Sequence, residues 1–106
     1  MSKVSIVRID GDRISQAVRA AIDLVGGMAE VVRPGETVLL KPNWCVVPAE
    51  PKVGVVTNPQ VVQAVADLVT EAGATPIISD SAARGVDTDV VIAETGYGEL
   101  RKKGIV

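Results

Sequence analysis

Residues 37–40 read TVLL, residues 57–60 read TNPQ, and residues 76–79 read PIIS. The first and last are short apolar runs typical of strands, and we expect 37–40 to be buried on both faces. The middle stretch begins a helix, through either a Thr57-x-x-Gln60 capping box or an Asn58 cap with Pro59 in the first turn. Strand, helix and strand in this order predict a right-handed crossover and a parallel sheet.

Upstream of this unit the sequence predicts a further strand and helix. Residues 4–9 are rich in β-branched side chains, which favour a strand. From Ile14 to Val25 apolar residues recur at helical spacing, with Asp10 or Asp12 available as the N-cap and Gly26-Gly27 as the stop. This part of the chain therefore adds a second strand–helix pair.

Downstream, residues 80–86 are mostly small and predict a loop. Asp87 or Thr88 can cap a helix that ends at Gly96, and Glu99 to Lys103 add one more turn. The chain ends in the apolar pair at 105–106, where we expect a fourth strand to begin.

Strands that alternate with helices place the chain in the α/β class. We expect a three-layer sandwich with a mostly parallel sheet, built from βαβ units and incomplete at its C-terminus. Residues 1–106 would then form a single α/β domain or the N-terminal segment of a larger one.

Composition limits the chemistry that the chain can carry. It has 106 residues, with one cysteine and no histidine, which excludes imidazole catalysis, an internal disulfide and a cluster held by several of its own thiolates. Its 11 basic and 13 acidic residues are mixed along the chain, so neither nucleic acid nor a membrane is an expected partner. No apolar stretch approaches the roughly 20 residues that span a bilayer, and we expect a cytoplasmic protein.

Polar residues follow the predicted strands and open the central helix. They are Lys41, Asn43, Thr57, Asn58, Asp80 and Ser81. The carboxyl ends of parallel strands lie at one rim, where ligands usually bind, so we expect these side chains to meet there. A cation, free amides at a helix N-terminus and hydrogen-bonding side chains suit a small anionic ligand. Asp80 would bind a hydroxyl or a metal-bound water. The sequence identifies no catalytic residue and no set of metal ligands.

Each of these residues also has a purely structural interpretation. Lys41 could simply reach water, and Asn43 could stabilise a turn. Thr57 and Asn58 are adequate helix caps, and the Asp80-Ser81 pair suits local turn or cap hydrogen bonding. Only their expected convergence on one rim favours a functional role.

The long segment from Lys41 to Thr57 has no periodicity, which indicates a functional or disordered loop. Within it, Trp44 is expected to anchor the loop, with stacking on a ligand as the alternative. Cys45 is expected to be a small hydrophobic residue rather than a nucleophile. The Gly96-Tyr97-Gly98 motif follows a helix, so we interpret it as a helix stop rather than a phosphate loop.

Several local patterns resemble one known family in their order and spacing. They are Lys41-Pro42-Asn43-Trp44, residues 54–59, residues 71–74, Ser79-Asp80-Ser81 and residues 94–97. Together they resemble the domain of unknown function 362 family, with the similarity running from about Val4 to the C-terminus. Longer members of that family continue further, and many carry a ferredoxin-like segment with cysteines for [4Fe–4S] clusters. The resemblance thus implies an iron–sulfur-associated, redox-linked whole protein, with no cofactor in this segment.

The leading hypothesis is an N-terminal α/β segment of such a protein that binds a small anion at the strand ends. The alternative is a non-catalytic assembly module whose unfinished sheet edge, at residues 105–106, pairs either with downstream sequence or with another copy to form a homo-oligomer. A redox enzyme in its own right would need a cofactor that the chain cannot hold through its own thiolates. The sequence leaves open whether the chain is an enzyme.

Overall fold

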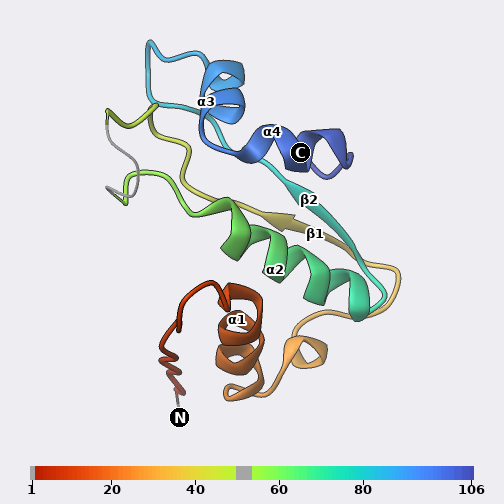
Figure 1. The fold of residues 1–106 in the computed structure, drawn as a ribbon. Coiled ribbons are helices and arrows are strands. Elements are labelled where there is room, and N and C mark those ends of the chain that lie inside the picture. The colour runs from red at the N-terminus through yellow and green to blue at the C-terminus, as the bar shows by residue number, and fades with distance from the viewer. Residues whose placement is uncertain (1, 50–53) are drawn as a thin grey trace.

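The computed structural model describes residues 2–49 and 54–106, and Figure 1 shows the order of the elements. They are α1 (Ile14–Asp23), the 3-10 helix η1 (Met28–Glu30), β1 (Thr37–Leu40), α2 (Pro59–Glu71), β2 (Thr75–Ile78), α3 (Thr88–Glu94) and α4 (Tyr97–Lys102). Strands β1 and β2 pair in parallel, with Thr37 opposite Thr75. The predicted central βαβ unit and the α/β class are therefore confirmed.

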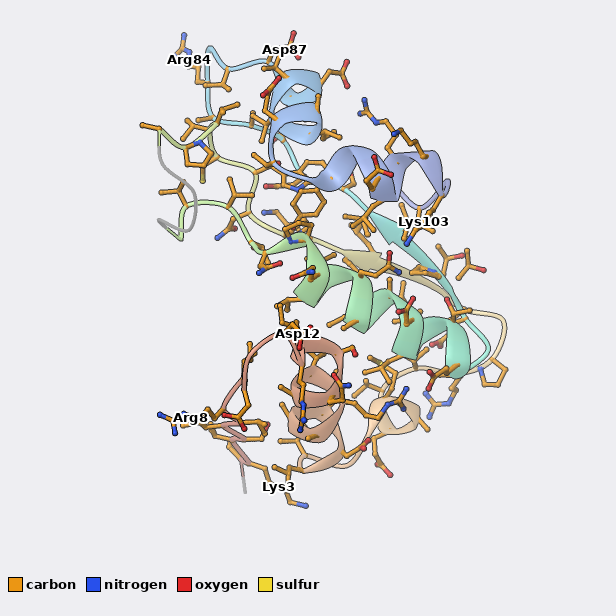
Figure 2. The ribbon with its side chains drawn as sticks, in the orientation of Figure 1. Lys3, Arg8, Asp12, Arg84, Asp87 and Lys103 are labelled. Carbon is orange, nitrogen blue, oxygen red and sulfur yellow. The ribbon has the colours of Figure 1, made fainter. Side chains whose placement is uncertain are left out.

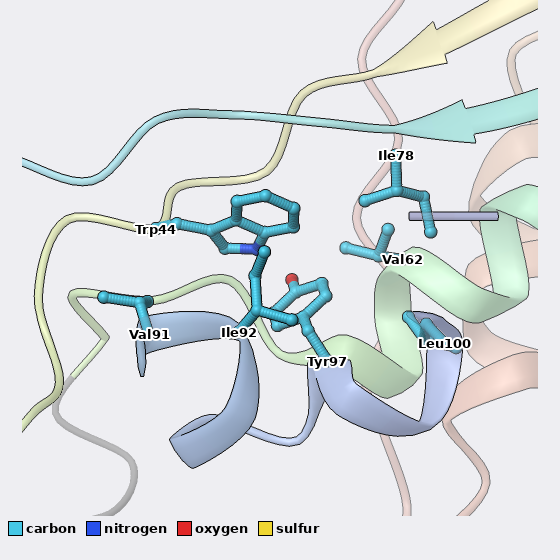
Figure 3. Close-up of a cluster of buried hydrophobic side chains, with 7 residues drawn as sticks. All are labelled: Trp44, Val62, Ile78, Val91, Ile92, Tyr97 and Leu100. Carbon is cyan, nitrogen blue, oxygen red and sulfur yellow. The ribbon is translucent and has the colours of Figure 1, made fainter. Parts of the chain in front are cut away.

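Helices α2, α3 and α4 cover one face of the two-stranded sheet, and α1 packs against α2. On that face Leu40 and Ile78 contact a buried cluster beneath α2, α3 and α4, which Figure 3 shows in close-up. Its buried members are Trp44, Val62, Ile78, Val91, Ile92, Tyr97 and Leu100. Val38 packs with a second cluster at the far end of α2, built on Val32, Val69 and Ala74. The hydrophobic core therefore lies between the sheet and helices α2, α3 and α4.

Among residues 2–49 and 54–106, no helix covers the opposite face of the sheet. Leu39 is 64% exposed and Ile77, its partner in the register, is 44% exposed. The prediction that residues 37–40 are buried on both faces is therefore wrong, because their burial alternates along the strand. In the part of the chain that the structure describes, helices and sheet form two layers rather than the three that we expected.

The predicted strand at residues 4–9 is also wrong, because this segment is irregular. It lies beside α1, and in the described part of the chain no strand supplies ladder hydrogen bonds to it. Ser5 Oγ donates a hydrogen bond to the Ala21 carbonyl of the helix at 2.6 Å. Val4 and Ile6 are 86% and 91% exposed. The predicted helix is confirmed as α1, but neither Asp10 nor Asp12 caps it, since Arg13 occupies the N-cap position without a side-chain bond.

Helix α2 begins through the second of the two predicted arrangements. Asn58 is the N-cap, Pro59 is in the first turn, and Asn58 Oδ1 accepts a hydrogen bond from Gln60 N at 2.8 Å. The capping box is not formed, because Thr57 Oγ1 instead accepts a hydrogen bond from Asn43 N. Helix α2 ends before Gly73, whose φ of +86° favours glycine.

The C-terminal third follows the predicted order with different boundaries. Asp87 caps α3 by accepting a hydrogen bond from Asp89 N at 2.8 Å, and Gly96, at φ +87°, separates α3 from α4. No strand forms at residues 105–106, but Ile78 N donates to the Ile105 carbonyl at 2.7 Å. Since Thr75 and Ser79 direct their amides to β1, this bond lies on the other edge of β2.

Two further predictions concern the loop and the membrane. The segment from Lys41 to Thr57 contains no helix or longer strand where it is described, only an antiparallel bridge between Trp44 and Val56; its residues 50–53 lie outside the described residues. Over residues 2–49 and 54–106, none of the helices combines the length and the apolar character needed to cross a membrane.

Candidate functional site

Lys41 and Asp80 meet at the carboxyl ends of β1 and β2. Lys41 directly follows β1, and Asp80 lies two residues beyond the end of β2. Lys41 Nζ lies 2.9 Å from Asp80 Oδ1, with the lysine side chain 66% exposed and the aspartate side chain 10% exposed. The parallel register explains this encounter, because it brings both strand ends to the same rim.

The Asp80 carboxylate also holds the loop that follows β1. Its second oxygen, Oδ2, accepts a hydrogen bond from Trp44 N at 2.9 Å. The hydrogen bond from Lys41 is the main reason that the pKa of Asp80 is lowered, the backbone amides of Trp44 and Ser81 add to the effect, and burial opposes it. Asp80 is therefore an ionised anchor for two segments of the rim.

Asn43 and Thr57 are joined at the base of the long loop. Asn43 N donates to Thr57 Oγ1 at 3.0 Å, and Thr57 N donates to the Asn43 carbonyl at 3.1 Å. These two bonds extend the bridge between Trp44 and Val56 and close the loop. The Thr57 hydroxyl is thus engaged with the backbone, whereas the Asn43 residue is exposed.

The N-terminus of α2 offers fewer donors than we expected. Pro59 has no N–H, the Gln60 amide is bonded to the Asn58 side chain, and the Val61 amide is bonded to the Asn58 carbonyl at 3.1 Å. These amides are satisfied within the helix cap, so they do not reach out to a ligand in this conformation. Among the described residues, no hydrogen bond or ion pair joins Asn58 to Lys41 or Asp80.

The six predicted site residues therefore fall into two groups. Lys41, Asp80 and the exposed Ser81 share one rim position. Thr57 and Asn58 instead line a hollow of about 320 Å³ together with Pro59, Glu94 and Thr95 and residues 47–48 and 54–56. Asn43 connects the two groups through its backbone bonds with Thr57 and through its neighbour Trp44, whose amide is bonded to Asp80.

Tyr97 is a positioning residue that the sequence did not reveal. Its hydroxyl donates to the Thr57 carbonyl at 2.6 Å, and its ring packs against Trp44. Burial raises the pKa of Tyr97 to about 12, and the nearby indole of Trp44 opposes that rise. Trp44 Nε1 is buried without a hydrogen-bonding partner in the described part of the chain. The sequence placed Tyr97 in a helix stop and in a family-like pattern at residues 94–97, but neither signal indicated its contact with the loop.

Trp44 is 1% exposed, which confirms it as the anchor of the loop. Cys45 next to it is exposed. That it is a small hydrophobic residue rather than a nucleophile stays a prediction. Over residues 2–49 and 54–106, no group of three or more cysteine, aspartate or glutamate side chains is placed to hold a metal ion. A [4Fe–4S] cluster takes four thiolates, so the single cysteine of this chain does not fit such a group.

Comparison with known proteins identifies one family. Residues 38–106 match the family described as Domain of unknown function (DUF362). The chain is 39% identical over 88 residues to the thylakoid-associated protein sll1697 of Synechocystis sp., an alignment that covers 80% of this chain and 27% of that protein. It thus spans about a quarter of the length of this relative. No solved structure matches the chain.

Proposed function

The chain belongs to the DUF362 family, and from this premise we propose that it binds a small anionic ligand at the carboxyl ends of β1 and β2. One observation carries the proposal: the Lys41 side chain, 66% exposed, is fixed at this rim by a nearly buried carboxylate. The binding site would act within a longer protein, as the length of the relative suggests.

The ion pair leaves the lysine able to bind. An ammonium group has three N–H donors, and Asp80 engages the Lys41 amino group through one oxygen at 2.9 Å. Its remaining donors are accessible to a carboxylate or phosphate oxygen. Asn43 and Ser81 are exposed on the neighbouring loops and can supply further hydrogen bonds. Since Asp80 neutralises much of the lysine charge, we expect weak binding that depends on geometry rather than on net charge.

Thermal unfolding in the presence of inorganic phosphate or acetate tests this site. Binding to the native state raises the melting temperature with ligand concentration, and Lys41→Gln should abolish the increase. Lys3→Gln is the matched control, because it removes the same charge from the exposed N-terminal segment. An equal response of all three proteins would show that Lys41 binds no anion.

A second candidate function is assembly, and the uncovered sheet face favours it. Parallel sheets are normally covered on both faces, whereas Leu39 and Ile77 lie side by side and exposed. A partner on this face would supply the third layer that the sequence predicts. Sedimentation over a wide concentration range tests this role, and a monomer at every concentration would contradict it.

The redox association remains a proposal for the longer protein. A cluster would have to be ligated by cysteines outside these residues, since this chain has a single one. Expression of a longer family member and its absorption spectrum test that link.

The cytoplasmic location also stays a prediction.

A further inference from the structure

Residues 4–9, which we call the N-terminal arm, have the side chains of a strand but pair with no strand within residues 2–49 and 54–106. Val4 and Ile6 are 86% and 91% exposed, while Ser5 between them and Val7 after them are half-buried. This alternation has the period of two that β structure has. Large aliphatic side chains that are almost fully exposed indicate a segment suited to burial elsewhere.

The outer edge of β1 is open to a further strand. The carbonyls of Glu36 and Leu40 accept hydrogen bonds from Thr75 N and Ser79 N of the β2 side. In a parallel ladder this register directs the amides and carbonyls of Thr37 and Leu39 to the opposite edge. No residue in the described ranges pairs with that edge, which therefore presents a row of unpaired backbone donors and acceptors.

The direction of α1 indicates which segment belongs on this edge. Helices α1 and α2 run in parallel, since Ile14 and Ser15 share a hollow with Pro59 and Gln60 while Arg19 pairs with Glu71 at 2.6 Å. Helix α1 therefore starts at the rim where β1 ends, as a crossover helix does. Right-handed crossovers place the strand before such a helix parallel to β1. That preceding strand would be the arm.

The arm of the same copy is directed elsewhere. Figure 2 shows Lys3 and Arg8 on the side of α1 that faces away from the sheet. The Ser5 bond to Ala21 holds the arm against α1, and bonds from Arg13 N to the Asp10 carbonyl and from Ile14 N to the Asp12 carbonyl close the turn between them. The open β1 edge is thus accessible to an arm from outside.

We propose that two copies of this chain exchange arms, so that residues 4–9 of each copy form a strand on the β1 edge of the other. The inference rests on the assembly role proposed above, and it places the contact between copies at the β1 edge rather than on the uncovered sheet face. The exchange is reciprocal, because each copy has one arm and one edge, and the resulting dimer is closed by a two-fold axis. It places β-branched side chains next to Leu39 and satisfies the edge of β1.

Ile6→Lys tests the arm, with Val90→Lys as its control. Ile6 is 91% exposed and Val90, on α3, is 49% exposed, so neither change should unfold the single copy, which circular dichroism checks. By size-exclusion chromatography with light scattering, the unchanged chain and Val90→Lys should dimerise with concentration. Ile6→Lys should raise the dissociation constant at least about tenfold, because a charge replaces the isoleucine that would pack beside Leu39 and shield it from water.

Cross-linking distinguishes exchange from closure within one chain. In a Cys45→Ser background, Ile6→Cys chains are mixed with Leu39→Cys chains and treated with a short bis-maleimide. A covalent dimer that contains one chain of each kind supports exchange. A chain carrying both cysteines that cross-links only within itself would overturn it. A dimer whose dissociation constant is unchanged by Ile6→Lys would overturn arm exchange but not the assembly role. A chain that is monomeric at all concentrations would overturn both arm exchange and assembly.

Discussion

The ring of Tyr97 meets the indole of Trp44 nearly edge to face, with ring centroids 5.1 Å apart and planes at 70° (Figure 3). This is a favoured geometry for aromatic pairs. Trp44 comes from the loop after β1 and Tyr97 is the first residue of α4. The contact therefore fixes the loop that leads away from Lys41 to the C-terminal helices.

Tyr97→Phe should destabilise the protein without disturbing the aromatic contact. The change removes the hydroxyl that donates to the Thr57 carbonyl at 2.6 Å. We expect a loss of about 1 kcal/mol in the free energy of unfolding, measured with urea. Ser15→Ala is the control, because it removes an exposed hydroxyl and should change the stability little. Equal stability of Tyr97→Phe and the unchanged chain would contradict the role of this bond.

The titration of Tyr97 should be displaced to high pH. Its pKa is raised from 10.0 to about 12 by burial. The folded state therefore holds the proton more tightly than the unfolded state does, so the stabilisation is complete below pH 10.0 and is lost as the pH rises towards about 12. Because the chain has one tyrosine, tyrosinate absorbance reports on it alone. A midpoint near 10.0 in the folded protein would show that the hydroxyl is solvated.

The central unit was predictable because its signals are local. The apolar run at 37–40 and the Asn58-Pro59 pair each specify an element within a few residues. Residues 4–9 have equally strong strand composition, yet a strand also requires a partner edge, which sequence composition does not provide. The exposure of Leu39 was not predictable for the same reason. Burial of the sheet face on which Leu39 lies requires a further layer of structure, which the composition of the strand does not reveal.

The candidate site was predictable to a similar extent. The encounter of Lys41 with Asp80 follows from parallel strands that end at one rim. The role of Tyr97 was not predictable, because its bond to Thr57 joins residues 40 positions apart. Nor did the sequence indicate that the Asn58 cap occupies the amides of α2, because that depends on which of two arrangements forms.

Asp80→Ala should cost more stability than Lys41→Gln, although the two residues form one ion pair. Removal of the aspartate leaves Trp44 N without its acceptor, and we expect a loss of about 1–3 kcal/mol. Removal of the exposed lysine breaks only the ion pair and should cost less than about 1 kcal/mol. Urea unfolding of both variants and of the double variant measures the difference. Equal losses would mean that the bond to Trp44 N contributes nothing.

The lowered pKa of Asp80 predicts a dependence on acid. The ionised carboxylate is favoured in the folded state, mainly by the hydrogen bond from Lys41. Its contribution is therefore present above the pKa of an unfolded aspartate and is lost as the pH falls through the lower folded pKa. The free energy of unfolding, measured across the acidic range, should fall with decreasing pH less steeply in Asp80→Asn than in the unchanged chain. An unchanged slope would assign the acid sensitivity to other carboxylates.

Gly96→Ala and Gly98→Ala should have opposite effects, although the two glycines flank the same tyrosine. Gly96 has φ +87°, and a Cβ there would lie 3.1 Å from Pro59 Cγ at the start of α2. We expect a loss of about 1–2 kcal/mol from the left-handed backbone alone, with further strain from the proline. Gly98 lies inside α4 with its nearest neighbouring atoms 3.9 Å from such a Cβ, so alanine should stabilise the helix by up to about 1 kcal/mol. Thermal unfolding of the two variants measures both changes, and a neutral Gly96→Ala would mean that the α3–α4 turn relaxes without cost.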